Sequence, residues 1–440
     1  MYRLSRPTGK IEGEINLVGS KSLANRALII QALATAPFEI EQLAAAQDTQ
    51  RLQELLASDE EILNTGPAGT TYRFLTAYLC TKSGSQTLTG SARMLERPIG
   101  VLVDALRSLG AHIEYLGEEG FPPIRIGHRP LDKQKRVEID GSTSSQFISA
   151  LLMIAPTLPN GLELKLTGQI VSRPYIEMTL ALMEKYGAQW AWDEEEQLIT
   201  IEKGAYLPKH SQGSDGNGNF KVEADWSAAS YYYSMAAISE EADLHITGLQ
   251  ADSLQGDSAL VDIYQKFGVR TSFESGGVRL LKGKQHPTSS QWPPALIEQD
   301  FLRCPDLAQT LSVTCAALGT QGLFSGLETL LIKETDRIAA LKTELAKLGV
   351  YLSKLPPKLA GRSRKTFYLQ EGKAQLAEVP TFSTYHDHRM AMAFAPLAML
   401  GTIDLEEPMV VAKSYPDFYT DLTSLGFIVE ELDTIATSIQ

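Results

Sequence analysis

The chain has 440 residues, of which 43% are hydrophobic and 21% are charged, a composition typical of soluble globular proteins with a large core. Its net charge of −13 argues against nucleic acid as a partner, because nucleic acid usually selects a basic surface. No apolar run approaches the roughly 18 residues of a membrane span, and the first residues lack an apolar signal core. We therefore expect a cytoplasmic protein that binds neither nucleic acid nor a membrane.

The cysteines add a second exclusion. Cys80, Cys304 and Cys315 are odd in number and have no CxxC spacing, so neither a disulfide framework nor a zinc site is expected. A small anionic substrate remains compatible with the acidic composition, since a local group of Arg and Lys can focus an anion into a cleft.

In chain order, six segments run from small or polar residues into an apolar helix, and the last four open at evenly spaced aspartates. These segments are 19–34, 66–80, 140–155, 225–239, 306–319 and 387–400. Their helices are apolar almost all round, as buried helices are. Between them lie alternating, strand-like stretches such as 162–168 and more amphipathic helices such as 335–350. Each repeat is thus predicted to hold strands and two helices, one of them inside.

Three repeats per globule predict an α/β protein of two lobes. The stretch 210–219 has the most linker-like composition of the chain, so we expect a lobe boundary near residue 222; the alternative is a long surface loop. The distance from Lys21 to Gly69 is shorter than the later spacings, which predicts that the second repeat is shortened and lacks a strand pair.

Anion-binding groups follow the first two helix starts. Lys21 directly precedes a helix whose N–H groups and dipole suit phosphate or carboxylate, with Ser22 and Arg26 on the same helix. Gly69, in a tight turn, would allow a ligand close to the backbone. Arg97 stands beside a Pro that starts a helix, and Arg binds oxyanions bidentately. Helix capping and charged surface turns are the alternatives for each motif alone.

The later helix starts carry hydroxyls, acids and further cations. Ser144, Ser145 and Gln146 belong to a run of polar residues longer than helix capping requires. Lys333 and Arg337 are four residues apart, with Glu334 between them as a possible proton carrier or a member of a salt-bridged surface. The histidines 386 and 388 could suggest a metal, but the neighbouring Arg389 favours an anion. Taken together, these groups predict a cleft between lobes for substrates rich in phosphate and carboxylate.

The motifs GSKSLANRA, AGTTYR, RMLERPIG, DGSTSSQF, SRPYIE, PDLAQT, KETDR, DHRMAM and AKSYPDF resemble, in this order, those of the 5-enolpyruvylshikimate-3-phosphate (EPSP) synthases. The resemblance runs nearly end to end. It implies two lobes, each of three βαβαββ repeats with buried helices and outer sheets. It also implies that the chain crosses twice, so that 1–18 joins 224–440 in lobe one, 19–223 forms lobe two, and the hinge lies near 18–20 and 222–225.

The resemblance further implies transfer of the enolpyruvyl group of phosphoenolpyruvate to the 5-hydroxyl of shikimate 3-phosphate, in aromatic amino acid biosynthesis, without metal or organic cofactor. Shikimate 3-phosphate would be bound by Ser22, Arg26, Ser144, Ser145, Gln146, Ser172, Tyr175, Asp306 and Lys333. Phosphoenolpyruvate would be bound by Lys21, Gly69, Arg97, Gln146, Arg337, Arg389 and Lys413. The catalytic residues would be Asp306, Glu334 and Lys21, whereas Asp140, Asp225 and Asp387 would cap helices or stabilise neighbours.

Two alternatives stay open at this point. One is a UDP-N-acetylglucosamine enolpyruvyl transferase, which shares the fold and the donor, although its reactive Cys loop is not evident in this sequence. The other is a catalytically silent anion-binding protein of the same fold. We expect the active enzyme, acting as a monomer on its two small-molecule substrates.

Overall fold

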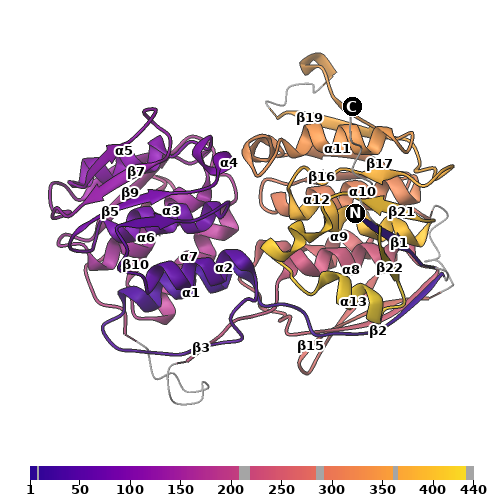
Figure 1. Ribbon diagram of the computed structural model, residues 1–440, viewed down its shortest axis with the longest axis horizontal. Helices are drawn as coiled ribbons and strands as arrows, with labels where there is room; N and C mark the ends of the chain where they lie inside the picture. Colours follow the sequence, from indigo (N-terminus) through magenta and orange to yellow (C-terminus); the bar gives the residue numbers. More distant parts are fainter. Residues whose placement is uncertain (7–8, 208–218, 284–291, 360–364, 433–440) are drawn as a thin grey trace, which may run out of the picture. The chain divides into compact units, whose positions relative to one another are not determined.

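A computed structural model describes residues 1–6, 9–207, 219–283, 292–359 and 365–432, and its elements are labelled in Figure 1. The chain divides into two compact units. Lobe one consists of Met1–Val18 and Ala224–Gln440, and lobe two consists of Gly19–Glu223. The predicted linker at 210–219 lies, apart from its last residue, outside the described residues.

In the described part of lobe two, two repeats have a four-stranded sheet each. Their strand orders are β4-β5-β7-β6 and β10-β11-β9-β8. The strands are β4 (Ile62–Asn64), β5 (Ser85–Thr89), β6 (His112–Tyr115), β7 (Ile124–Gly127), β8 (Arg136–Asp140), β9 (Leu162–Thr167), β10 (Trp190–Asp193) and β11 (Leu198–Ile201). In each sheet a parallel pair is followed by an antiparallel hairpin, the order βαβαββ.

The helices of lobe two fall into a buried and an outer set. The buried helices are α1 (Lys21–Leu33), α3 (Gly69–Leu79) and α6 (Ser145–Ile154), which pack on one another. The outer helices are α2 (Gln47–Leu56), α5 (Gly100–Leu109) and α7 (Arg173–Lys185), and a short α4 (Ala92–Leu95) precedes α5. A buried helix connects β4 to β5 and β8 to β9, as parallel strands require a crossover.

One repeat of lobe two is shortened. The repeat that opens at Lys21 has a two-stranded parallel sheet of β3 (Ile40–Glu41) and β12 (Phe220–Lys221). In the fully described stretch 57–61 the chain runs from α2 to β4 without a strand. The shortening therefore falls between Lys21 and Gly69 as expected, but it reduces the first repeat; the second, which opens at Gly69, has its complete sheet.

Lobe one has three four-stranded sheets in its described part, with orders β20-β21-β1-β22, β14-β15-β13-β2 and β16-β17-β19-β18. Its strands are β1 (Tyr2–Ser5), β2 (Lys10–Ile15), β13 (Glu241–Thr247), β14 (Arg270–Glu274), β15 (Gly277–Lys282), β16 (Leu296–Asp300), β17 (Gln321–Ser325), β18 (Tyr351–Lys354), β19 (Phe367–Glu371), β20 (Thr381–Phe382), β21 (Ile403–Leu405) and β22 (Ile428–Glu431). Figure 1 shows the indigo β1 beside the yellow β21, and both β21 and β22 pair with it antiparallel.

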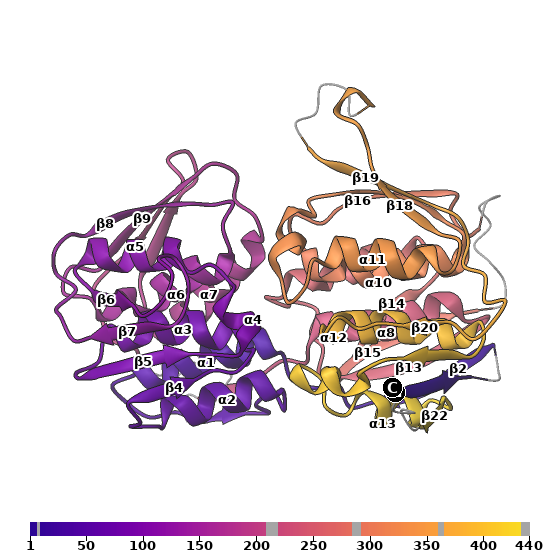
Figure 2. The same ribbon diagram turned by 45° about the horizontal axis from the view of Figure 1, so that its top comes forward.

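The core of lobe one is formed by three buried helices, α8 (Trp226–Ile238), α10 (Ala308–Leu318) and α12 (His388–Phe394). Hydroxyl pairs join the first two: Ser230 to Thr310 at 3.0 Å and Ser234 to Thr314 at 2.8 Å. The outer helices are α9 (Leu260–Gln265), α11 (Arg337–Ala346) and α13 (Phe418–Ser424). Figure 2 shows α10 and α11 against the sheet that contains β16 and β18.

Short 3₁₀ helices lead into several site segments: η2 (Gly256–Ala259), η3 (Pro305–Leu307), η4 (Glu328–Ile332) and η7 (Pro408–Lys413). Within the described ranges, every helix is too short or too polar to cross a bilayer. Over the same ranges, His, Cys, Asp and Glu side chains do not gather in groups of three or more that could hold a metal ion.

Candidate active site

The first candidate residues of lobe two lie at the start of α1. Ser20 caps this helix by accepting from the Leu23 N–H, so Lys21 occupies its first turn. The Lys21 Nζ lies 3.1 Å from Asp48 Oδ2, and both side chains are largely buried. Thr71 on α3 donates to the Asp48 carbonyl at 3.0 Å. The Lys21 ammonium is thus held at a helix start, where an anion would meet unpaired N–H groups.

Arg26 lies one turn further along α1 and is 2% exposed. Its guanidinium donates to Thr179 Oγ1 at 2.7 Å and to Ser149 Oγ at 3.0 Å, and also to the carbonyls of Ser22 and Tyr175. Burial lowers the pKa of Arg26 to about 10, so it stays charged near neutral pH. Because these partners are neutral, the side chain keeps its positive charge while it fastens α1 to α6 and α7.

Gly69, the first residue of α3, lies against two arginines. A Cβ placed on Gly69 would be 2.4 Å from Arg97 Nη1 and 2.7 Å from Arg73 Nη1. Arg73 donates to Gln146 Oε1 at 2.8 Å, and Gln146 Nε2 donates to Thr70 Oγ1 at 2.8 Å. The absence of a side chain at Gly69 therefore lets two guanidinium groups and an amide converge at one helix start.

The predicted hydroxyl groups lie at the starts of α6 and α7. Ser144 caps α6 by accepting from the Gln146 N–H, and Ser145 is the first residue of that helix. Ser172 precedes α7 with a φ of 53°, a left-handed conformation that costs energy for a residue with a side chain and is often found at functional sites. The Tyr175 N–H donates to the Ser172 carbonyl, and the Tyr175 ring lies 5.8 Å from the Arg26 guanidinium carbon.

The centre of the lobe one site is Arg337, whose side chain is 2% exposed. In the described residues it contacts three carboxylates: Asp387 at 2.7 Å, Glu334 at 2.9 Å and Asp306 at 3.0 Å. Burial lowers the pKa of the Arg337 guanidinium, but the carboxylates, Asp387 foremost, outweigh burial and raise it above its ordinary value. Asp306 and Glu334 bind different terminal nitrogens, so one guanidinium holds both predicted proton carriers.

Three further cations surround these acids. Arg389 Nη2 lies 2.9 Å from Asp306 Oδ2, and Lys413 Nζ lies 3.7 Å from Glu334 Oε1. Lys333 is partly exposed at the end of η4; burial lowers its pKa, while the charge of Asp306 acts in the opposite direction. The structure thus brings the six predicted lobe one residues into one region of alternating charge.

The loop before α12 explains how Asp387 reaches Arg337. Tyr385 and His386 both have a φ of 53°, and two such residues in succession strain the backbone. The buried Glu344 accepts from the Tyr385 hydroxyl at 2.7 Å and from the Ser383 N–H at 3.1 Å. These bonds stabilise the turn that ends at Asp387, the N-cap of α12.

The four evenly spaced aspartates have different roles. Asp225 and Asp387 cap α8 and α12, which confirms that part of the prediction. Asp140 instead accepts from the Ser142 N–H in the turn before α6, whose N-cap is Ser144. Asp306 precedes α10 and pairs with Arg337 and Arg389.

Three polar residues of the site have no role in the prediction from the sequence: Asp48, Arg73 and Ser227. Asp48 pairs with Lys21, Arg73 joins Gly69 to Gln146, and Ser227 accepts from Arg389 Nη2 at 3.4 Å. Arg73, four residues after Gly69 on the same helix, carried a usable signal because that spacing brings side chains onto one face. Asp48 and Ser227 carried none, since their partners are distant in the sequence.

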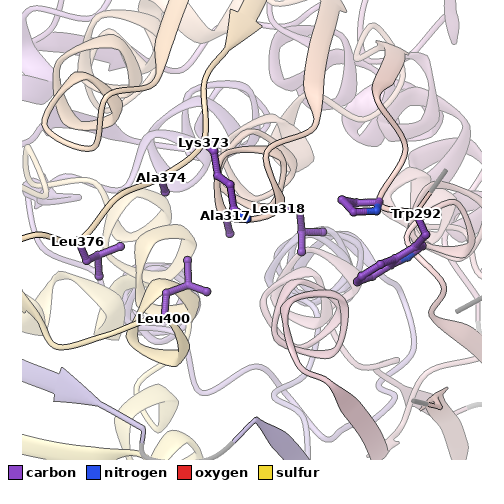
Figure 3. Close-up of a pocket in the computed structure, with 8 residues that line it drawn as sticks. Trp292, Ala317, Leu318, Lys373, Ala374, Leu376 and Leu400 are labelled. Carbon is purple, nitrogen blue, oxygen red and sulfur yellow. The ribbon is translucent and has the colours of Figure 1, made fainter. Parts of the chain in front are cut away.

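A separate cavity of about 400 Å³ lies in lobe one and contains none of the candidate residues. Figure 3 shows Trp292 and Leu318 on one side of it and Lys373 with Leu400 on the other. Lys373 is the one charged residue among those that line it.

Known proteins that are similar to this chain over nearly its whole length agree on its family. The family model described as EPSP synthase (3-phosphoshikimate 1-carboxyvinyltransferase) matches residues 5–58 and 50–422. A 3-phosphoshikimate 1-carboxyvinyltransferase of Bacteroides fragilis is 46% identical over 429 residues, which cover 97% of this chain and 98% of that protein. The chain belongs to the EPSP synthase family. A relative of the same name from Mannheimia haemolytica is 34% identical over 455 residues, which cover 96% of this chain and 98% of that protein.

Solved structures agree with the fold of an EPSP synthase family member. An EPSP synthase from Acinetobacter baumannii matches with a TM-score of 0.71 at 20% identity, covering 98% of this chain and 100% of that one. A second structure of that enzyme gives a TM-score of 0.73 at 18% identity. The predicted fold class of the EPSP synthases, α/β with repeated βαβαββ units, is therefore confirmed.

Proposed function

We propose that this chain carries out the reaction of its family with the residues described in both lobes. It is a 3-phosphoshikimate 1-carboxyvinyltransferase: it transfers the enolpyruvyl group of phosphoenolpyruvate to the 5-hydroxyl of shikimate 3-phosphate and releases phosphate. The observation that supports the residue roles best is that Arg337 binds Asp306 and Glu334 on different nitrogens, with Arg389 and Lys413 beside them.

The reaction needs groups that can move two protons. The 5-hydroxyl loses its proton as its oxygen bonds to C2 of phosphoenolpyruvate, and C3 gains a proton to become a methyl group. The resulting tetrahedral intermediate then loses phosphate as C3 gives up a proton, which restores the double bond. We assign Asp306 to the hydroxyl proton and Glu334 to the C3 proton, with Lys21 as a further catalytic cation.

The remaining candidate residues bind the two anions. Phosphoenolpyruvate is assigned to cations and to the amide and glycine beside them: Lys21, Gly69, Arg97, Gln146, Arg337, Arg389 and Lys413. Shikimate 3-phosphate is assigned to a more hydroxyl-rich set: Ser22, Arg26, Ser144, Ser145, Gln146, Ser172, Tyr175, Asp306 and Lys333. The cations offset the repulsion between two anionic substrates and stabilise the departing phosphate.

The assigned acids and cations require no metal or organic cofactor in the steps above. We also propose that the enzyme works as a monomer in the cytoplasm. Sedimentation of the purified protein and fractionation of cells that express it test these two points separately.

The alternative acceptor UDP-N-acetylglucosamine is not favoured, since the family model and the relatives share the name 3-phosphoshikimate 1-carboxyvinyltransferase. A silent protein of this fold would lack turnover. Mixing the purified chain with both substrates should release phosphate and form the enolpyruvyl ether, seen by mass spectrometry. Absence of both products from the folded protein, or equal turnover with UDP-N-acetylglucosamine, would overturn the proposal.

A further inference from the structure

A buried carboxyl group outside the assigned residues is connected to the proton carriers of lobe one. Asp257, in η2, is 4% exposed. Its Oδ2 accepts a hydrogen bond from the Ser227 hydroxyl. Within the described residues its other oxygen is buried and has no hydrogen-bond partner. Burying a carboxyl oxygen without a hydrogen-bond partner costs folding free energy. A carboxyl that is kept at such a cost beside the site is a candidate for a functional role.

The loop around Asp257 is fixed to the helix that carries Ser227. The buried Gln255 accepts from the Trp226 N–H at 3.1 Å and donates to the Ala224 carbonyl at 2.7 Å. These two bonds attach the segment before η2 to the start of α8. Asp257 is therefore held in a defined position against Ser227.

Two hydrogen bonds and an ion pair lead from Asp257 to Asp306. Ser227 donates to Asp257 and accepts from Arg389 Nη2 at 3.4 Å, while the same nitrogen lies 2.9 Å from Asp306 Oδ2. The carboxylate thus orients the serine hydroxyl so that a lone pair faces Arg389. Arg389 in turn contacts the predicted acid.

We propose that Asp257 is a positioning residue: through Ser227 it orients Arg389, and its charge sets how readily Asp306 loses its proton. The proposal rests on the proposed function, because Arg389 and Asp306 take their roles from it. Asp257 itself touches no reacting atom.

The electrostatic surroundings of Asp257 support this role. Burial raises the pKa of Asp257 to about 7, with a further rise from the charge of Asp306, whereas Arg389 and the Ser227 hydrogen bond lower it. Asp225, the N-cap of α8, adds a smaller repulsion, and the Cys304 thiol also faces this group. Two carboxyls that interact in this way titrate as a pair. Ionisation of Asp257 near neutral pH therefore opposes ionisation of Asp306.

Two variants separate charge from position. Asp257→Asn keeps an acceptor for Ser227 but cannot ionise, so the limb of the pH profile of kcat near pH 7 should move to lower pH by about one unit. Ser227→Ala breaks the link to Arg389, so KM for phosphoenolpyruvate should rise about tenfold while KM for shikimate 3-phosphate stays within about twofold.

Asp421→Asn is the matched control. Asp421 is also a partly buried carboxyl in lobe one, bonded by a hydroxyl, that of Tyr415, and burial raises its pKa. Its replacement should leave the pH profile unchanged. If the wild-type chain turns over and Asp257→Asn has the wild-type pH profile, the positioning role is wrong. If the wild-type chain forms no product, the proposed function fails instead.

A measurement without turnover completes the test. Because the pKa of Asp257 is raised on folding, the folded state binds a proton more tightly, so this group favours folding less as pH rises from about 4 to about 7. Urea unfolding of Asp257→Asn should lack this loss relative to the wild type, whereas Glu328→Gln, which replaces an exposed acid of η4, should keep it. Equal pH dependence of the wild type and Asp257→Asn would contradict a buried, titrating Asp257.

Discussion

The candidate residues of the two lobes hold their arginines in opposite ways. In lobe two, Arg26 donates to hydroxyls and carbonyls, and Arg73 donates to an amide. In lobe one, Arg337 and Arg389 contact carboxylates. An arginine with neutral partners keeps its charge for an anion, whereas an arginine among carboxylates controls where protons reside. We infer that lobe two binds anions without the acids that move protons, whereas lobe one combines anion-binding cations with those acids; Lys21 and Asp48 form an ion pair that departs from this division.

The largest expected effect tests the proton-transfer role. Asp306→Asn and Glu334→Gln keep the size of each side chain but remove the acid, so kcat should fall by about 10²–10⁴. Steady-state phosphate release measures the loss. Glu328→Gln, an exposed acid in η4, is the matched control and should stay within about twofold. Comparable losses in all three variants would show that the effect is not specific to the proposed acids.

The ion pair between Lys21 and Asp48 in lobe two gives the next prediction. Lys21→Met removes a cation assigned to phosphoenolpyruvate and leaves the buried Asp48 without it, so kcat/KM should fall by about 10²–10³ and stability should drop by about 2–3 kcal/mol. The double variant Lys21→Met/Asp48→Asn removes both charges. It should regain most of the stability in urea unfolding but none of the activity; recovery of activity would contradict a catalytic role for Lys21.

The partners of the arginines can be compared directly. Asp387→Asn preserves the helix cap but removes the charge opposite Arg337, and we expect a loss of about 3 kcal/mol in the free energy of unfolding. Thr179→Val removes one neutral acceptor from Arg26 and should cost about 1 kcal/mol. Chemical denaturation of both variants measures the difference. Equal losses would contradict the contrast between the lobes.

A smaller effect is expected at Gly69. A methyl group there would meet the Arg97 and Arg73 guanidinium groups below 3 Å, so Gly69→Ala should raise KM for phosphoenolpyruvate about tenfold with a smaller change for shikimate 3-phosphate. Gly204→Ala, where a Cβ would meet nothing within 4 Å, is the control, and equal kinetics in both variants would argue against Gly69 as a contact.

Much of the fold could be predicted from local patterns. Strand alternation at 162–168 predicted β9, and the apolar segment at 225–239 predicted α8 with Asp225 as its cap. The shortened repeat was also visible, because Lys21 and Gly69 are closer than later repeat starts. Its assignment to the second repeat was wrong, since the missing strands follow α2 rather than the helix that opens at Gly69.

The contacts of the site could not be predicted from local patterns. From the sequence, KETDR was compatible with a salt-bridged helix surface, yet Arg337 is buried between Glu334 of the same motif and two acids from distant segments, Asp306 and Asp387. The pairing of β1 with β21 and β22 joins opposite ends of the chain. The link from Asp257 through Ser227 to Arg389 likewise depends on how η2, α8 and α12 pack. The spacing of residues in the sequence does not predict that packing.

The division between binding and proton transfer is tested most directly by titrating Glu334→Gln with shikimate 3-phosphate in a calorimeter. We expect a dissociation constant within about twofold of the wild-type value, because Glu334 is assigned to a proton and not to this substrate. A tenfold or larger loss of affinity in the folded variant would contradict the proposed division of roles between the lobes.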